Sequence, residues 1–232
     1  YSITDLYSLY TRKHSKEDML IRDIYNELRI GKFTNAYEKL SNLNPESFVS
    51  EYYKMSYDFC MIHVQHMLGR VSDIHVLQMY SELINYPDCM NNESFNFNEI
   101  NALTRIINIS ADVNNFDAAN KLYEIINKGK FKYSSLNEST LLPSLYYTIA
   151  RVFYLQEEDE KTIELTTLGY QAAISSESTN ALPQIYILDA IAKKNLERLD
   201  EAYISVRKCF MLLILTENKS AIESFKASYY KV

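Results

Sequence analysis

Glycine and proline are scarce in this sequence, with four of each among 232 residues. Strand-rich folds and nucleotide-binding α/β folds of this length use both residues in their many turns. The shortage argues against both fold classes and favours a chain built from helices.

Cysteine is scarce as well: Cys60, Cys89 and Cys209 are odd in number and widely spaced. Disulfide-stabilised secreted domains carry paired cysteines, so we expect free thiols in a reducing compartment and a cytoplasmic protein. The formal net charge is −6, and no lysine and arginine cluster stands out. Because nucleic-acid-binding modules present a basic face, we do not expect this part of the protein to bind DNA itself.

Long apolar runs are missing too. The longest extends from Cys209 to Leu215, far less than a membrane span requires. The sequence shows no signal peptide and does not begin with methionine. We therefore expect no membrane partner and a missing segment upstream.

What the sequence does contain is a repeat of about forty residues. Three segments share a polar turn, an apolar residue and an alanine three positions later. These pairs are Phe33 with Ala36, Phe116 with Ala119, and Leu199 with Ala202. Weaker copies begin at Ile74 and Glu160, and the five anchors are separated by 41, 42, 44 and 39 residues. We expect the apolar residue to plug each hairpin and the alanine to let the second helix approach the first.

This period predicts an all-α, right-handed solenoid of helical hairpins, similar to tetratricopeptide repeats, with about five repeats. We expect a linker or arriving helix at 1–14 and a single repeat domain at 15–232. Ser15 to Asp18 form a capping pattern for the first helix, and Asn44 with Pro45 opens the second repeat. A cap helix is expected at about 219–229. The later first helices are expected at 95–111, 141–156 and 181–196.

Two clusters have the composition of metal sites without the geometry. Cys60, His63 and His66 recur every third residue, which spreads them over about 120° of a helix. The acidic run 157–160 is more simply a solvated turn before a helix. We expect no metal and no cofactor. The sequence also lacks a phosphate loop, a nucleophile elbow and a zincin motif, so we expect a protein that is not an enzyme.

The first helices of the later hairpins carry a polar face beside their apolar stripe. The polar positions are Asn101, Arg105 and Asn108 on the first, Tyr147, Arg151 and Tyr154 on the second, and Gln184, Asp189 and Lys193 on the third. First helices of such solenoids usually line a concave groove, where amide, guanidinium and phenol groups suit a short peptide. All of these positions except Lys193 are our predicted peptide-binding residues. The alternative is that they are ordinary hydrophilic faces of amphipathic helices.

The segment from Phe210 to Leu215 is apolar on every side of its helix. It is either enclosed by the C-terminal cap or exposed as a dimer contact. Within it, Phe210, Met211, Leu213 and Ile214 are our predicted dimerisation residues.

The turns Gly31–Tyr37 and Asn115–Ala119 resemble degenerate tetratricopeptide repeats. Over nearly the whole chain, size and a Tyr-, Asn- and Ile-rich composition resemble the C-terminal domain of peptide-responsive bacterial regulators of the Rgg, PlcR and Rap kind. The segment Leu9–Ser15 followed by Asp23–Tyr25 resembles the domain junction of Rgg-like proteins.

This resemblance implies a cytoplasmic homodimer whose groove binds an imported pheromone peptide in quorum sensing. It also implies an N-terminal helix-turn-helix domain that reads DNA and is absent from this sequence. Peptide contacts in the family fall on groove-facing Asn, Arg and aromatic residues. The matching positions are Asn101, Arg105, Asn108, Tyr147 and Arg151.

Our leading hypothesis is therefore the ligand-sensing and dimerisation domain of a bacterial transcriptional regulator. A second hypothesis is a protein-interaction scaffold without a small regulatory ligand. A third, a hydrolase or phosphatase hidden in the groove, requires a set of acids or metal ligands that converges only in space.

Overall fold

The computed structural model describes residues 3–133 and 136–215, and these residues confirm the all-α prediction. The helices are α1 (Ile3–Arg29), α2 (Phe33–Ser41), α3 (Glu51–Met67), α4 (Asp73–Leu83), α5 (Phe97–Asp112), α6 (Asp117–Asn127), α7 (Leu136–Ser139), α8 (Leu142–Leu155), α9 (Asp159–Ser175), α10 (Leu182–Asn195) and α11 (Leu199–Leu215), with 3-10 helices η1 (Pro45–Ser47) and η2 (Asp88–Asn91). Within the described ranges there is no strand, only a parallel bridge between Phe95 and Tyr133. None of the helices described is long and apolar enough to cross a bilayer.

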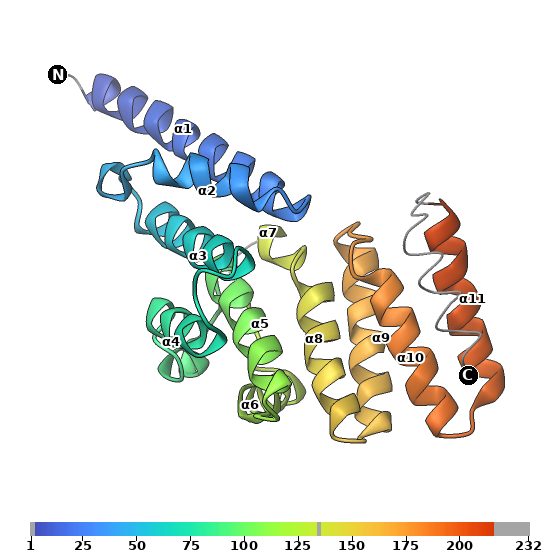
Figure 1. Cartoon of the computed structure of the whole chain (residues 1–232). Coiled ribbons are helices and arrows are strands. Elements are labelled where there is room, and N and C mark those ends of the chain that lie inside the picture. The colour runs from blue at the N-terminus through green and yellow to red at the C-terminus, as the bar shows by residue number, and fades with distance from the viewer. Residues whose placement is uncertain (1–2, 134–135, 216–232) are drawn as a thin grey trace. The chain divides into compact units, whose positions relative to one another are not determined.

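The chain divides into two compact units, residues 1–92 and 93–232. The first unit holds the hairpins α1–α2 and α3–α4, and the second holds α5–α6, α8–α9 and α10–α11. These are the five hairpins that the repeat predicts. In the second unit α8, α9, α10 and α11 lie side by side in chain order (Figure 1). A single repeat domain over 15–232 stays a prediction.

The hairpin turns share one backbone geometry. The residues that follow the first helices have φ between +58° and +75°: they are Gly31, Gly69, Asn114, Glu157 and Glu197. In the first turn the Gly31 amide donates to the Leu28 carbonyl, and the Lys32 amide donates to the Glu27 carbonyl. The same two hydrogen bonds recur in the other four turns. This pair is the Schellman motif, which satisfies the last carbonyls of a helix and reverses the chain.

The helices of a hairpin pack closely at the small residues that the repeat predicts. Ala36, Ala119 and Ala202 are 0%, 1% and 7% exposed, so the second helices do approach closely at these points. A further close approach occurs at Gly169, where a Cβ atom would lie only 3.0 Å from the Ile185 Cδ1 atom. The close contact of α9 with α10 therefore depends on the missing side chain of Gly169.

The predicted hairpin plugs are wrong at two turns. Leu199 and Ile74 are 64% and 79% exposed, whereas Phe33 and Phe116 are half-buried. The turns are closed by main-chain hydrogen bonds, so they form without an apolar plug.

The predicted start of the first helix is also wrong. Helix α1 continues through Ser15, so the boundary between 14 and 15 is not a helix end. No glycine or proline occurs before Gly31, and without a residue that breaks it the helix continues. Asn44 caps the short helix η1, accepting from the Glu46 amide at 3.1 Å, and Ser50 is the cap of α3. The expected cap helix at 219–229 lies outside the described residues.

Burial of side chains in the second unit predicts which substitutions lower the free energy of unfolding. Ile149 on α8 is fully buried, so Ile149→Ala should lower the free energy of unfolding by about 2–5 kcal/mol through lost burial and a cavity. Ile174 on α9 is 58% exposed, and Ile174→Ala should change the same quantity by only about 0.5 kcal/mol. Urea denaturation followed by circular dichroism measures both. Equal losses would contradict the packing described for α8.

Candidate ligand-binding site

The exposed and half-buried side chains along the first helices of the second unit form what we call the first-helix face. Its members are Asn101, Arg105, Asn108 and Asp112 on α5, Ser144, Tyr147, Arg151 and Tyr154 on α8, and Gln184, Ile187, Ile191 and Lys194 on α10. On each helix they recur at intervals of three or four residues, which keeps them on one side. Helix α8 packs against both α5 and α10, so the three rows are neighbours.

On α5, two of the predicted amides are already partly engaged. The Asn101 Nδ2 atom donates to the Phe97 carbonyl of its own helix at 3.1 Å. The Asn108 Nδ2 atom donates across to Thr148 Oγ1 on α8 at 3.3 Å. Each amide keeps its carbonyl oxygen as an acceptor for a ligand. Arg105 is half-buried on the same side of the helix.

On α8, the predicted residues Tyr147, Arg151 and Tyr154 are all half-buried. The guanidinium of Arg151 donates from Nη2 to Asp112 Oδ1 on α5 at 2.8 Å. Asp112 was not among the predicted site residues, although it continues the row of Asn101, Arg105 and Asn108 one turn further along α5. The sequence signal for Asp112 was its position one repeat before Arg151.

On α10, only Gln184 of the predicted binding residues lies on the first-helix face, where it is exposed. Asp189, a predicted peptide contact, points to the other side of the helix and is 7% exposed. Lys193 lies beside Asp189 on that same side. The outer positions on α10 are instead the apolar Ile187 and Ile191, which a search for polar residues passed over.

Several polar contacts between hairpins join residues about one repeat apart. Asn108 reaches Thr148, Arg151 reaches Asp112, and on the second helices the Tyr123 hydroxyl donates to Glu164 Oε2 at 2.8 Å. Such contacts fix the register of neighbouring hairpins. The face that carries the candidate ligand contacts is therefore also the face that holds α5 and α8 in register.

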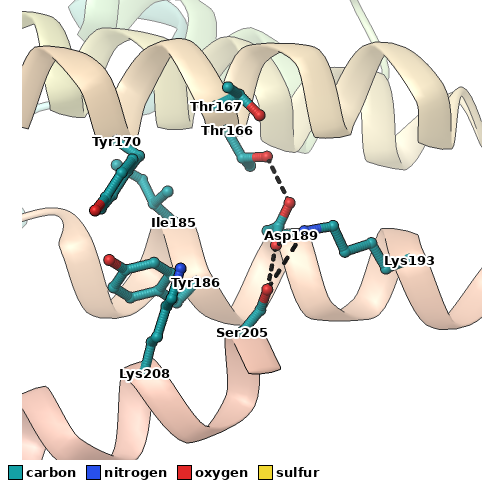
Figure 2. Close-up of a pocket in the computed structure, with 9 residues that line it drawn as sticks. All are labelled: Thr166, Thr167, Tyr170, Ile185, Tyr186, Asp189, Lys193, Ser205 and Lys208. Carbon is teal, nitrogen blue, oxygen red and sulfur yellow. Dashed lines mark hydrogen bonds and ion pairs between the residues drawn. The ribbon is translucent and has the colours of Figure 1, made fainter. Parts of the chain in front are cut away.

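Asp189 is the centre of a buried polar cluster that ties three helices together. Its Oδ1 atom accepts from Thr166 of α9 at 3.2 Å, and its Oδ2 atom accepts from Lys193 at 2.7 Å and from Ser205 of α11 (Figure 2). The Lys193 and Asp189 side chains are only 17% and 10% exposed. Ser205 is itself 4% exposed, and its hydroxyl donates to Asp189 within the cluster.

The predicted dimerisation residues on α11 fall into two groups. Met211 and Ile214 are 54% and 49% exposed, while Leu213 is 3% exposed and Phe210 is half-buried. Leu213 faces the protein interior and is unavailable to a partner in this structure. The exposed apolar surface of α11 extends beyond the predicted segment to Ile204, which is 52% exposed.

The clusters weighed as metal sites do not converge. Cys60 and His63 are buried within the first unit, and the His66 Nε2 atom lies 2.8 Å from Asp73 Oδ1. Over the residues described, no group of three or more His, Cys, Asp or Glu side chains is arranged to hold a metal ion. All three cysteines are buried free thiols, as expected, and burial raises the pKa of Cys60 to about 12.

The buried pair of Asp189 with Lys193 and the exposed pair of Asp112 with Arg151 should differ in their effect on stability. Asp189→Asn leaves the Lys193 ammonium nearly buried without a counterion, which should lower the free energy of unfolding by about 3–5 kcal/mol. Asp112→Asn removes the partner of Arg151 where the carboxylate is 63% exposed, so the loss should be about 1 kcal/mol or less. Urea denaturation tests both variants. A loss for Asp189→Asn no larger than for Asp112→Asn would contradict the role of the cluster.

Comparison with known proteins finds similarity in fold alone. No family model and no curated protein matches the sequence. The structure of Bacillus thuringiensis PlcR in its apo form matches with a TM-score of 0.80 and 12% identity, over 97% of this chain and 82% of PlcR. The structure of PlcR in complex with the peptide PapR7 and DNA matches with a TM-score of 0.66 and 13% identity, over 90% of this chain and 74% of PlcR. The chain thus has the helical-repeat fold of PlcR, which resembles tetratricopeptide solenoids, as the sequence resemblance implied.

Proposed function

We propose that this chain is the ligand-sensing and dimerisation domain of a bacterial transcriptional regulator and binds a short signalling peptide. The observation that carries this proposal is the fold match to PlcR over 97% of the chain, since PlcR has been solved with a bound peptide. The first-helix face of the second unit supplies the chemistry that peptide capture needs. Its neighbouring rows carry amides, guanidinium groups, phenols and two isoleucines, of which Ile187 is half-buried and Ile191 is exposed.

The peptide we favour is apolar and has a free C-terminus. Arg105 and Arg151 offer planar donor groups that suit a carboxylate, and the amides of Asn101, Asn108 and Gln184 bond to both donors and acceptors of an extended backbone. The phenol rings of Tyr147 and Tyr154 and the side chains of Ile187 and Ile191 give apolar surface for peptide side chains.

The pair between Arg151 and Asp112 suggests how a peptide engages α8. The Asp112 side chain is 63% exposed, so this ion pair is screened by water and contributes little to stability. A peptide carboxylate can replace Asp112 on the guanidinium at small cost. Because the same pair links α5 to α8, its exchange would alter the contact between neighbouring hairpins.

Regulation would follow from a difference in peptide affinity between two packings of the repeats or of the dimer. Such a difference would alter a DNA-binding domain outside this sequence, since the described helices show no basic face and the net charge is −6. Met211 and Ile214 of α11 are our proposed dimer contacts. We propose a cytoplasmic location, which the buried free thiols favour, and a protein that is not an enzyme.

Peptide binding is tested by calorimetry with a synthetic library of short apolar peptides that carry free C-termini. We expect a subset to bind, and the double variant Arg105→Ala, Arg151→Ala to weaken them about a hundredfold through lost charged hydrogen bonds. Arg207→Ala, an exposed change on α11, is the matched control and should leave affinity within about twofold. Circular dichroism verifies that each variant is folded.

Undiminished binding by the double variant would remove the first-helix face as the peptide site. If no library peptide binds and a folded partner protein is retained in pull-downs, the scaffold hypothesis is the correct one.

Dimerisation is tested separately, by sedimentation equilibrium. We expect wild-type protein to dimerise and Met211→Glu, Ile214→Glu to be monomeric, because charged groups in an apolar contact lose their hydration. Ile74→Glu on α4 is the control, since Ile74 is 79% exposed and lies outside the proposed contact. A dimer that survives the double substitution would place the interface elsewhere.

A further inference from the structure

A pocket opens between α9 and α11, and α10 forms its floor (Figure 2). Its volume is about 130 Å³. This is enough for several water molecules or a ligand of a few heavy atoms, and less than drug-sized ligands require. The walls combine the rings of Tyr170 and Tyr186 with the side chains of Ile185 and Lys208. The Asp189 cluster closes its inner end.

This pocket is separate from the first-helix face. Helix α10 turns by about 100° per residue, which places Ile185, Tyr186 and Asp189 about 180° away from Gln184, Ile187 and Ile191. A short peptide lying along the first-helix face therefore cannot enter the pocket. One helix presents a different surface on each side.

Two lysines and one carboxylate line the part of this pocket that the described residues form. Lys193 is paired with Asp189 at 2.7 Å, and Thr166 and Ser205 satisfy the remaining sites of that carboxylate. Among the residues described, Lys208 has no carboxylate within ion-pair distance. Its Nζ atom lies 5.6 Å from the Tyr170 ring centre and 5.8 Å from that of Tyr186. The pocket therefore has a net positive charge held over two aromatic rings.

The two tyrosines add neutral hydrogen-bond donors. Their ring centres are 5.7 Å apart, and both hydroxyls lie at the same side of the pocket (Figure 2). Burial, followed by the neighbouring Tyr170, raises the pKa of Tyr186 to about 12. Its phenol is therefore protonated at neutral pH. The tyrosine hydroxyls can therefore donate hydrogen bonds to a ligand in the pocket.

We propose that this pocket is a second ligand site, which binds a small carboxylate. The carboxylate would accept hydrogen bonds from Lys208 and from the tyrosine pair, and its apolar body would lie against Ile185 and the two rings. One net positive charge among aromatic walls matches a monoanion with an apolar part, whereas phosphate recognition favours several donors and arginine forks. The site goes beyond the proposed peptide face and does not depend on it.

Nuclear magnetic resonance of the ¹⁵N-labelled protein tests this site through the amide of Gly169. Gly169 lies on α9 next to Tyr170 and in contact with Ile185, and as one of four glycines its signal is readily resolved. The probes are sodium butyrate and the tripeptide N-acetyl-Ala-Ala-Leu, the latter with a free or an amidated C-terminus. Sodium chloride at equal ionic strength is the reference titration.

We expect a saturable shift of the Gly169 amide with butyrate, with the free-acid tripeptide, or with both, and none with the amidated tripeptide or chloride. Saturation by butyrate identifies a free small acid as the ligand source, and saturation by the free-acid tripeptide alone identifies a peptide terminus. Lys208→Met should weaken the response about tenfold or more, while Lys208→Arg should retain it. Lys121→Met makes the same charge change on α6, at an exposed lysine that lines neither the pocket nor the first-helix face, and should leave the response unchanged.

The proposal is overturned if neither carboxylate saturates the Gly169 shift, or if Lys208→Met responds like the wild-type chain. Circular dichroism of Lys208→Met and Lys208→Arg excludes loss of folding as the cause. If this test contradicts the pocket, the proposal that a peptide binds through Arg105 and Arg151 still stands. The two proposals rest on different residues and can fail independently.

Discussion

The contact on which the second unit depends is the burial of apolar side chains between successive helices. Ile149 and Phe153 of α8 and Leu165 of α9 are enclosed by neighbouring helices only, as in any array whose units stabilise one another in sequence. A helix in the middle of such an array uses two of its sides for packing and leaves the others free. For α10, the exposed side belongs to the first-helix face, and the opposite side, against which α9 and α11 pack, forms the floor of the pocket.

Polar contacts in this unit divide by burial into two kinds with different uses. The cluster around Asp189 is shielded from water and joins α9, α10 and α11, so breaking it leaves a charge uncompensated. The pair of Arg151 with Asp112 is exposed and exchangeable, because water can replace either partner. Under the proposed function, the buried kind keeps the hairpins folded and the exposed kind can be displaced by a ligand without unfolding them.

Sequence periodicity predicted the hairpins and the polar row on α5. On that helix Asn101, Arg105 and Asn108 recur on one side, and the apolar Ile100, Leu103 and Ile107 recur on another. It failed on α10, where Asp189 and Lys193 have the spacing of an exposed ion pair and are instead buried by α9 and α11. That burial is set by helices distant in sequence, which a single-helix pattern does not contain. The pocket was missed for the same reason: Tyr170, Tyr186 and Lys208 come from three helices, and only their packing brings them together.

The Schellman closure of the hairpin turns has an evolutionary consequence. Its hydrogen bonds join main-chain atoms, so the turn constrains the residue type mainly at the one position with positive φ. Glycine, asparagine and glutamate all occupy the equivalent position in this one chain. Descendants of a common repeat can therefore lose every recognisable residue while keeping their architecture. Proteins that share this fold are accordingly found by superposition of backbones, where a TM-score of 0.80 accompanies 12% identity.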